Sequence, residues 1–393
     1  MVSPPAEAPA QERHRRLVEL ALLFLRIGVT AFGGPAAHIA VMDREIVQRR
    51  KWLSKEEFVD LLGMTNLIPG PNSTELAIHI GHRRAGGLGL VVAGLAFILP
   101  AALIVGVLAA AYVQFGRLPN VAAAFYTIKP VMLAVVVQAL VGLGRTTVKT
   151  WPLAGLAVVD LAASFLGFHE LAVLGASGIV VAAAAWLRAR RAPDLVRGVL
   201  PLWTGLLTTS VVTSTALPVA TVGGLFFTFL KMGSVLFGSG YVLLAFLRAD
   251  LVERLHWLSE QQLLDAVAVG QFTPGPVFTT ATFVGYLIDG SRGALVSTLG
   301  IFLPAFVFVA LSVPLVPRIR RSAVAAGFLD GVNVASLALM AVVSWQLGRA
   351  ALVDGLTVAL AGIAVIVLLA TRVSTVWLIL AAAALGPLAN LLR

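Results

Sequence analysis

The sequence predicts an all-α membrane protein made of two inverted-topology repeats, with helices that are broken or re-entrant at the midplane of the bilayer. Three observations support this fold class. The chain is 59% hydrophobic and only 12% charged, whereas soluble domains carry roughly 25% charged residues. A Pro-Gly-Pro tripeptide occurs twice inside apolar sequence, at 69–71 and 274–276. Matching interruptions in two halves of a hydrophobic chain are typical of membrane proteins with discontinuous helices.

The repeat extends well beyond the tripeptide. The segment Phe24–Gly28 is echoed by Phe229–Gly233, and Trp52-Leu53-Ser54 is echoed by Trp257-Leu258-Ser259. The residue numbers differ by 205 in each case, and by 204 after a single slip that follows the Pro-Gly-Pro. Because almost no residue is gained or lost over this distance, we expect two copies of one fold.

The chain is expected to divide into four parts. Residues 1–16 form a cytoplasmic N-terminal arm, because the apolar segment after it has no small-residue cleavage site and the start does not resemble a removed signal. The first repeat covers 17–190, a linker with one crossing segment covers 191–217, and the second, inverted repeat covers 218–393. Segments of about 20 apolar residues can cross a bilayer, and they are expected at 87–115, 120–143, 151–168, 170–187, 293–317, 324–347, 353–371 and 373–391.

Two helical hairpins are expected ahead of the apolar segments of the first repeat. Residues 17–34 and 35–50 meet at Phe32-Gly33-Gly34-Pro35, and residues 54–68 and 72–82 meet at the Pro-Gly-Pro. Proline removes a helix hydrogen bond and glycine adds backbone freedom, so each junction should break a helix. The hairpins are interpreted as re-entrant, with full spans as the alternative. The repeats are inverted in both cases, because the linker adds one crossing.

The basic residues indicate the orientation in the membrane. Seven of them lie between 44 and 84, but only three lie between 248 and 292. Cytoplasmic loops are enriched in lysine and arginine, so the hairpin loops of the first repeat are expected inside and those of the second outside. The net charge of +10 sits in short clusters between apolar segments. We therefore attribute it to membrane topology and expect no nucleic-acid partner.

The starts of the interrupted helices are the expected anion site. A helix N-terminus presents unpaired N–H groups and roughly half a positive charge. With Arg26 and Lys231 as equivalent cations in the two halves, the total positive charge would be enough to balance a dianion. The alternatives are that Arg26 pairs with Asp60 and Lys231 with Asp265, and that the polar residues only repair the backbone at a kink. The expected substrate-binding residues are Arg26, Lys231, Gly33, Gly34, Asn66, Pro69, Gly70, Pro71, Asn72, Ser73, Thr74, Gly238, Ser239, Gly240, Pro274, Gly275, Pro276, Thr279 and Thr280.

Four ionisable side chains are candidates for ion coupling: Asp60, Glu75, His79 and Asp265. Glu75 and His79 lie four residues apart, which is the spacing of a side-chain pair on one helix face. A buried carboxylate beside an imidazole can carry a coupling proton, and a simple hydrogen-bonded pair is the alternative. Lys129 is interpreted as an interfacial residue, with an additional substrate contact as the alternative.

Several classes of function are excluded or disfavoured. The chain has no cysteine, which excludes disulfides, thiolate metal sites and cysteine nucleophiles. No Gly-rich phosphate loop with a following Lys-Ser or Lys-Thr is present, which argues against nucleotide hydrolysis. We expect no catalytic residue, no metal site and no cofactor. A membrane enzyme would have to rely on Glu75 with His79.

The motifs around the breaks resemble those of the chromate ion transporter family, in its long, two-domain form. The resemblance covers both halves and nearly the whole chain. Two features depart from a symmetric pattern: Ser239 stands where the first half has Gly34, and Asn72-Ser73 is replaced by Val277-Phe278, so the half-sites should be unequal. The motifs that carry the resemblance are Phe32–Pro35, Arg50–Ser54 with Glu57-Phe58, Asn66–Pro71, Phe237–Gly240 and Thr273–Pro276.

The resemblance implies a secondary transporter of the bacterial inner membrane that exports chromate and confers chromate resistance, with Arg26 and the two glycine–proline turns at its functional positions. The expected partners are chromate or a similar oxyanion, a coupling proton and membrane lipid, and a homodimer is left open. A sulfate or other oxyanion carrier, with uptake left open as its direction, is the first alternative. An anion channel is the second.

Overall fold

The computed structural model describes residues 10–32, 34–116, 118–190, 220–237, 240–319, 322–371 and 373–391, and these are helical with no strand. Within these ranges, five helices are long and apolar enough to cross a membrane. They are α4 (Asn72–Phe115), α5 (Pro119–Thr147), α7 (Glu170–Arg190), α11 (Thr280–Ile319) and α12 (Ala323–Ala351). The expected all-α membrane protein is therefore confirmed, and the chain is multi-pass.

The remaining elements follow the predicted segments closely. In the first half they are α1 (Ala10–Thr30), α2 (Gly34–Met42), the π-helix η1 (Asp43–Arg49), α3 (Lys55–Thr65) and α6 (Trp151–Phe165). In the second half they are α8 (Val222–Val235), η2 (Gly240–Val242), α9 (Leu243–Leu247), η3 (Arg248–Arg254), α10 (Glu260–Phe272), η4 (Val277–Thr279), α13 (Gly355–Ala370) and α14 (Thr375–Leu391). The expected crossing segment at 199–217 lies outside the described residues.

The duplication is visible in the backbone as well as in the sequence. Both halves contain a seven-residue π-helix at the same place, in η1 and η3. Ser54 and Ser259 each form a capping box at the start of the next helix, which satisfies backbone donors that a helix start leaves open. The long helices α4 and α11 are kinked at 85–86 and 289–290. Equivalent local signals have thus produced equivalent local structure.

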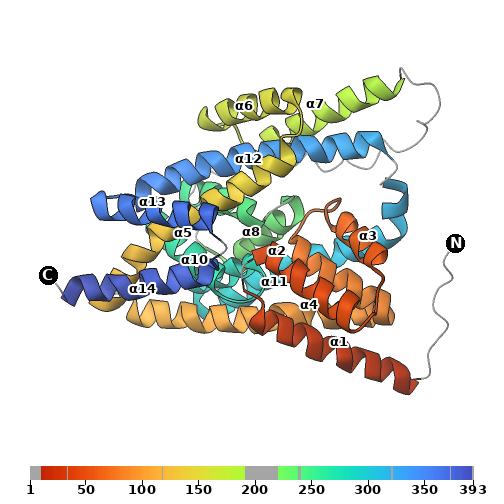
Figure 1. The fold of residues 1–393 in the computed structure, drawn as a ribbon, viewed down its shortest axis with the longest axis horizontal. Helices are drawn as coiled ribbons and strands as arrows, with labels where there is room; N and C mark the ends of the chain where they lie inside the picture. Colours follow the sequence, from red (N-terminus) through yellow and green to blue (C-terminus); the bar gives the residue numbers. More distant parts are fainter. Residues whose placement is uncertain are drawn as a thin grey trace.

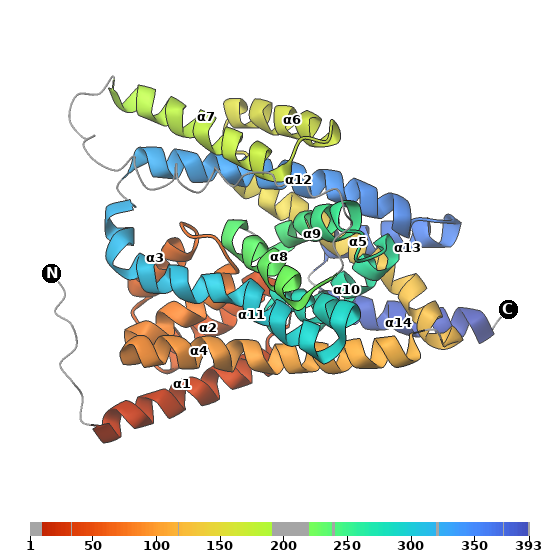
Figure 2. The ribbon, with the colours of Figure 1, turned by 180° about the vertical axis from the view of Figure 1, so that it is seen from behind.

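Equivalent helices of the two halves run in opposite directions. Helices α5 and α12 follow the long axis of the molecule with opposite polarity, and the start of α1 and the end of α14 lie at opposite ends of this axis (Figures 1 and 2). An inverted pair of repeats requires this arrangement. The orientation of each half relative to a membrane stays a prediction.

The two halves are interleaved and do not form separate bodies. Helix α5 packs against α13 and α14, and α12 packs against α6 and α7, while α4 and α11 meet in the middle. Polar contacts also join the halves: the Thr127 hydroxyl donates to the Ala382 carbonyl at 2.6 Å, and the Gln138 amide donates to the Leu368 carbonyl at 3.0 Å. Each half is therefore completed by helices from the other.

The helices that flank the first-half breaks differ in length. Helix α2 has 9 residues and α3 has 11, and 11 residues extend over only about 16 Å. Neither helix alone reaches across a hydrocarbon core of about 30 Å, whereas α1 has 21 residues and is long enough, so the re-entrant form of the hairpins stays a prediction. One boundary differs from expectation: α1 begins at Ala10, inside the expected arm, because Arg16 pairs with Glu12 and Arg15 with Glu19 one helical turn apart.

Candidate functional site at the helix breaks

Two backbone hydrogen bonds hold the breaks of the two halves against each other. The Gly70 N–H donates to the Leu236 carbonyl at 2.7 Å, and the Gly275 N–H donates to the Ala31 carbonyl at 3.1 Å. Both donors and both acceptors are equivalent pairs, 205 residues apart. We call these two bonds the crossed contact. Each Pro-Gly-Pro is therefore fixed by the end of the first helix of the opposite half, so the breaks share one interface.

Glycine is required in both tripeptides by conformation and by space. Gly70 has φ +138° and Gly275 has φ +86°, backbone values that side chains with a Cβ rarely adopt. A Cβ on Gly275 would lie 2.5 Å from the Ala101 Cβ. A Cβ on Gly28, in the helix before the crossed contact, would lie 2.7 Å from the Phe97 carbonyl oxygen. The close approach of these segments therefore depends on the absence of side chains.

The break in the first half contains polar groups that are not used in hydrogen bonds to the backbone of the break. Asn66 is exposed, and its side-chain oxygen accepts a hydrogen bond from the Asn72 amide at 2.8 Å. Thr74 and Glu75 donate their backbone N–H groups to the Pro71 carbonyl, so the first two N–H groups of α4 have no intrahelical acceptor. The Thr74 hydroxyl is buried and has no hydrogen-bond partner within the described part of the chain. This helix start can therefore still bind an anion.

The break in the second half is buried like the first, but its two threonine hydroxyls are satisfied by the backbone. Pro274, Gly275 and Pro276 are all buried. The Thr279 and Thr280 hydroxyls donate to the Pro276 and Val277 carbonyls, both at 2.8 Å, which is the backbone-repair role considered from the sequence. Gly240 is buried at the start of η2, whereas Gly33, Gly238 and Ser239 lie outside the described residues. The half-sites are unequal, as the sequence predicts.

The two predicted cations lie in different environments. Arg26 is exposed, on the face of α1 away from Phe24 and Ile27. Lys231 forms an ion pair of 2.5 Å with Asp250, a buried residue of η3 that also binds Arg254 at 2.8 Å. The alternative pairing of Lys231 with Asp265 is therefore wrong, because Lys231 reaches the π-helix instead of α10.

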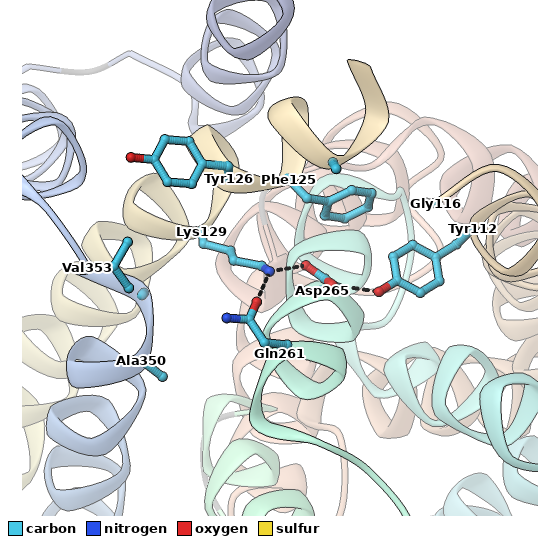
Figure 3. Close-up of a pocket in the computed structure, with 11 residues that line it drawn as sticks. Tyr112, Gly116, Phe125, Tyr126, Lys129, Gln261, Asp265, Ala350 and Val353 are labelled. Atoms are coloured by element: carbon cyan, nitrogen blue, oxygen red, sulfur yellow. Dashed lines mark hydrogen bonds and ion pairs between the residues drawn. The ribbon is translucent and has the colours of Figure 1, made fainter. Parts of the chain in front are cut away.

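Asp265 belongs to a different cluster, near the middle of α10. Its carboxylate pairs with the Lys129 ammonium at 3.0 Å and accepts a hydrogen bond of 2.6 Å from the Tyr112 hydroxyl (Figure 3). Only 13% of the Lys129 side chain is exposed, and the interpretation of Lys129 as an interfacial residue stays a prediction. Asp60, the equivalent of Asp265, is exposed on α3. The two acidic candidates therefore do not share one environment.

Glu75 is the most unusual ionisable group near the breaks. It is fully buried in the first turn of α4, next to Gly70, and neither carboxylate oxygen has a hydrogen-bond partner among the described residues. The Nε2 of His79 lies 3.5 Å from the Ser312 hydroxyl of α11, so the expected Glu75–His79 pair is not formed. An unpaired buried charge is very costly. A charge on Glu75 would therefore need a partner that the described residues do not supply.

His38 is a site residue that the sequence reasoning did not identify. It is fully buried; its Nε2 contacts the Ala31 carbonyl at 3.1 Å and its Nδ1 contacts the Ser73 hydroxyl at 3.3 Å. It thereby connects an acceptor of the crossed contact with the start of α4. A polar residue shortly after the Phe-Gly-Gly-Pro turn was the available signal. The equivalent position in the second half is Leu243.

Comparisons with known proteins agree on one family. The chromate transporter family model matches residues 18–185 and 223–387, one segment in each half. The chromate transport protein of Cupriavidus metallidurans is 32% identical over 375 residues, covering 94% of this chain and 92% of that protein. The chromate transport protein of Pseudomonas aeruginosa is 31% identical, covering 92% and 90%. A probable chromate transport protein of Synechococcus elongatus is 32% identical, covering 86% of each. No solved structure shows a significant match.

Proposed function

This chain belongs to the chromate transporter family, and from that premise we propose that it is a secondary active transporter that exports chromate across the bacterial inner membrane and confers resistance to it. The substrate class rests on the family match, which extends over both halves. The location rests on one structural observation, the crossed contact, because it brings the two helix breaks to a single interface. We expect no catalytic role for the chain.

The chemistry of the first break suits a tetrahedral dianion. The open N–H groups at the start of α4 and the positive end of the helix dipole favour an anion, and the side chains of Asn72, Ser73 and Thr74 add donors. Arg26 and Lys231 are proposed to attract the ion on the way to this site. In the conformation described, Lys231 is neutralised by Asp250, so the ion must compete with that carboxylate.

Glu75 is proposed to carry the coupling proton. An ionised carboxylate beside Gly70 would repel a dianion, whereas the neutral form leaves the start of α4 free to attract it. Protonation of Glu75 is therefore the condition for oxyanion binding. In a conformation that opens the break to water, the carboxyl can exchange its proton. The proton on Glu75 crosses with the dianion, so one net negative charge moves, and a membrane potential that is negative inside drives it outward with about 2.3 kcal/mol per 100 mV.

Transport by the purified full-length protein in liposomes tests this function. Chromate flux should be saturable, should exceed that of protein-free liposomes, and should respond to an imposed membrane potential and an imposed pH gradient. Absence of chromate flux under both gradients would refute the proposal. A potential response without a pH response would remove the coupling proton and leave the transporter.

A sulfate or other oxyanion carrier is the second candidate. It is favoured by the same observation, because N–H groups and hydroxyls at the first break fit any tetrahedral oxyanion. Equal flux of sulfate and chromate in the liposome assay, or a preference for sulfate, would support this candidate. A conductance too fast for a carrier, measured in a planar bilayer, would indicate a channel.

A further inference from the structure

A cavity of about 300 Å³ lies where the end of α4, the first part of α5, the first part of α10 and the end of α12 meet, and its lining includes no residue of either Pro-Gly-Pro (Figure 3). This volume is at the lower end of the range of small-molecule pockets. Its walls come from both halves: Tyr112 and Lys129 from α4 and α5, Gln261 and Asp265 from α10, and Val353 from the segment after α12. The described helices thus enclose a space between the repeats that the crossed contact does not use.

The polar wall of this cavity is a nearly buried charged cluster. The Lys129 ammonium contacts both the Asp265 carboxylate, at 3.0 Å, and the side-chain oxygen of Gln261, while Tyr112 donates to Asp265 (Figure 3). Only 13% of the Lys129 side chain and 6% of the Asp265 side chain are exposed. The amide nitrogen of Gln261 points toward the wall formed by Ala350 and Val353. Lys129 therefore donates to two acceptors, and Tyr112 donates to one of them.

The fold itself does not require this lysine. The equivalent residue in α12 is Asn333, which occupies the same place in a copy of the same helix. Charged residues buried within membrane segments are rare, and they usually serve a substrate or ion path. We therefore attribute Lys129 to a functional role and not to a requirement of the fold.

We propose that this cavity, which we call the Lys129 pocket, is a second anion site, in which Lys129 leaves Asp265 and binds a tetrahedral oxyanion on the outward path. Lys129, Tyr112 and the Gln261 amide supply donors to the ion. Asp265 is the resting counter-ion, which holds Lys129 when the pocket is empty and competes with the oxyanion for it. The identity of the anion rests on the proposed function, whereas the existence of the site does not.

Equilibrium binding of radiolabelled chromate and sulfate to the purified full-length protein in phospholipid-free detergent tests the proposal. Lys129→Gln should weaken binding at one of two sites by about tenfold or more, the usual effect of losing a charge-assisted hydrogen bond, and Lys129→Arg should retain it. Asp265→Asn should tighten binding at that site by about tenfold, because the competing carboxylate is gone. Lys149→Gln is the matched control, since it breaks an exposed pair with Asp330 and should change nothing.

A purely structural ion pair makes the opposite prediction for Asp265. If Asp265→Asn weakens oxyanion binding as much as Lys129→Gln does, the pair only joins α5 to α10 and the proposal fails. It also fails if neither variant alters binding. Displacement of the Lys129-dependent ion by added phosphatidylglycerol would reassign the pocket to a lipid headgroup. A wild-type protein without any oxyanion flux refutes the proposed function, whereas normal flux with no effect of Lys129 refutes only this site.

Discussion

Replacement of Gly275 by alanine tests the crossed contact most directly. This glycine donates its N–H to Ala31 of the other half, and two independent penalties oppose a side chain there. At φ +86° an L-residue is strained by about 1–2 kcal/mol. The new Cβ would also lie 2.5 Å from the Ala101 Cβ, and overpacking of this kind costs about 1–3 kcal/mol. We expect a total loss of about 2–5 kcal/mol in the free energy of unfolding.

Two further variants separate the penalties. Gly290 has φ +54°, but a Cβ there would meet nothing within 4 Å, so Gly290→Ala should cost only the strain of about 1–2 kcal/mol. Ala101→Gly should lose about 1 kcal/mol on its own, as glycine does in a helix. In combination with Gly275→Ala it removes the clash and should recover part of the stability. The recovery is partial because the Gly28 carbonyl oxygen would remain 3.1 Å from the new Cβ.

The assay is reversible unfolding in mixed detergent micelles with increasing dodecyl sulfate, followed by the loss of helical circular dichroism. The double-mutant cycle should give a favourable coupling of about 1–3 kcal/mol between positions 101 and 275. A coupling near zero would mean that the second break does not pack against α4. Equal effects of Gly275→Ala and Gly290→Ala would lead to the same conclusion.

Three other predictions follow from the same geometry. Gly28→Ala and Gly233→Ala should each cost about 1–3 kcal/mol of unfolding free energy, because the new Cβ would lie 2.7 or 2.3 Å from a carbonyl oxygen of the facing helix. The control is Gly142→Ala, which should not destabilise the protein because a Cβ there would meet nothing within 4 Å. Equal effects of the three variants would contradict the close packing at Gly28 and Gly233. Glu75→Gln should keep potential-driven chromate flux in liposomes but lose its response to a pH gradient; a retained response would assign the proton elsewhere. Gly87→Cys and Ser291→Cys occupy equivalent exposed positions in a chain without other cysteines, so a membrane-impermeant thiol reagent should label them from opposite sides, and labelling from one side would refute inversion.

The helices, the breaks and the duplication could be predicted because their signals are local. Proline and glycine act on the backbone where they stand, and the constant offset of 205 residues requires no knowledge of the tertiary structure. The boundaries of α5, α6 and α7 lie within a few residues of the expected apolar segments for this reason. The early start of α1 was missed because its charged first turns, stabilised by pairs such as Glu12–Arg16, have no hydrophobic signal.

The partners of the buried ionic groups could not be predicted. Lys231 pairs with Asp250, and Asp265 pairs with Lys129 of the other half. The helices that carry these residues are brought together only by tertiary packing, which sequence spacing does not reveal. Residues four apart on a helix, such as Glu75 and His79, are neighbours by geometry, yet His79 turns to Ser312 on another helix. Sequence spacing predicts which side chains share a face, but not what that face meets.

The differences between the halves indicate where a dianion would bind. Both copies conserve the devices that break and cap the helices, so these serve the fold. The buried polar side chains around the breaks have diverged: Glu75 corresponds to Thr280, and His38 corresponds to Leu243. In the first half, these side chains either have no hydrogen-bond partner among the described residues or connect the start of α4 to the crossed contact. In the second half, the threonine hydroxyls donate to backbone carbonyls of the same break. Substrate binding should therefore be far more sensitive to Ser73→Ala than to Thr279→Val, although both residues follow a Pro-Gly-Pro.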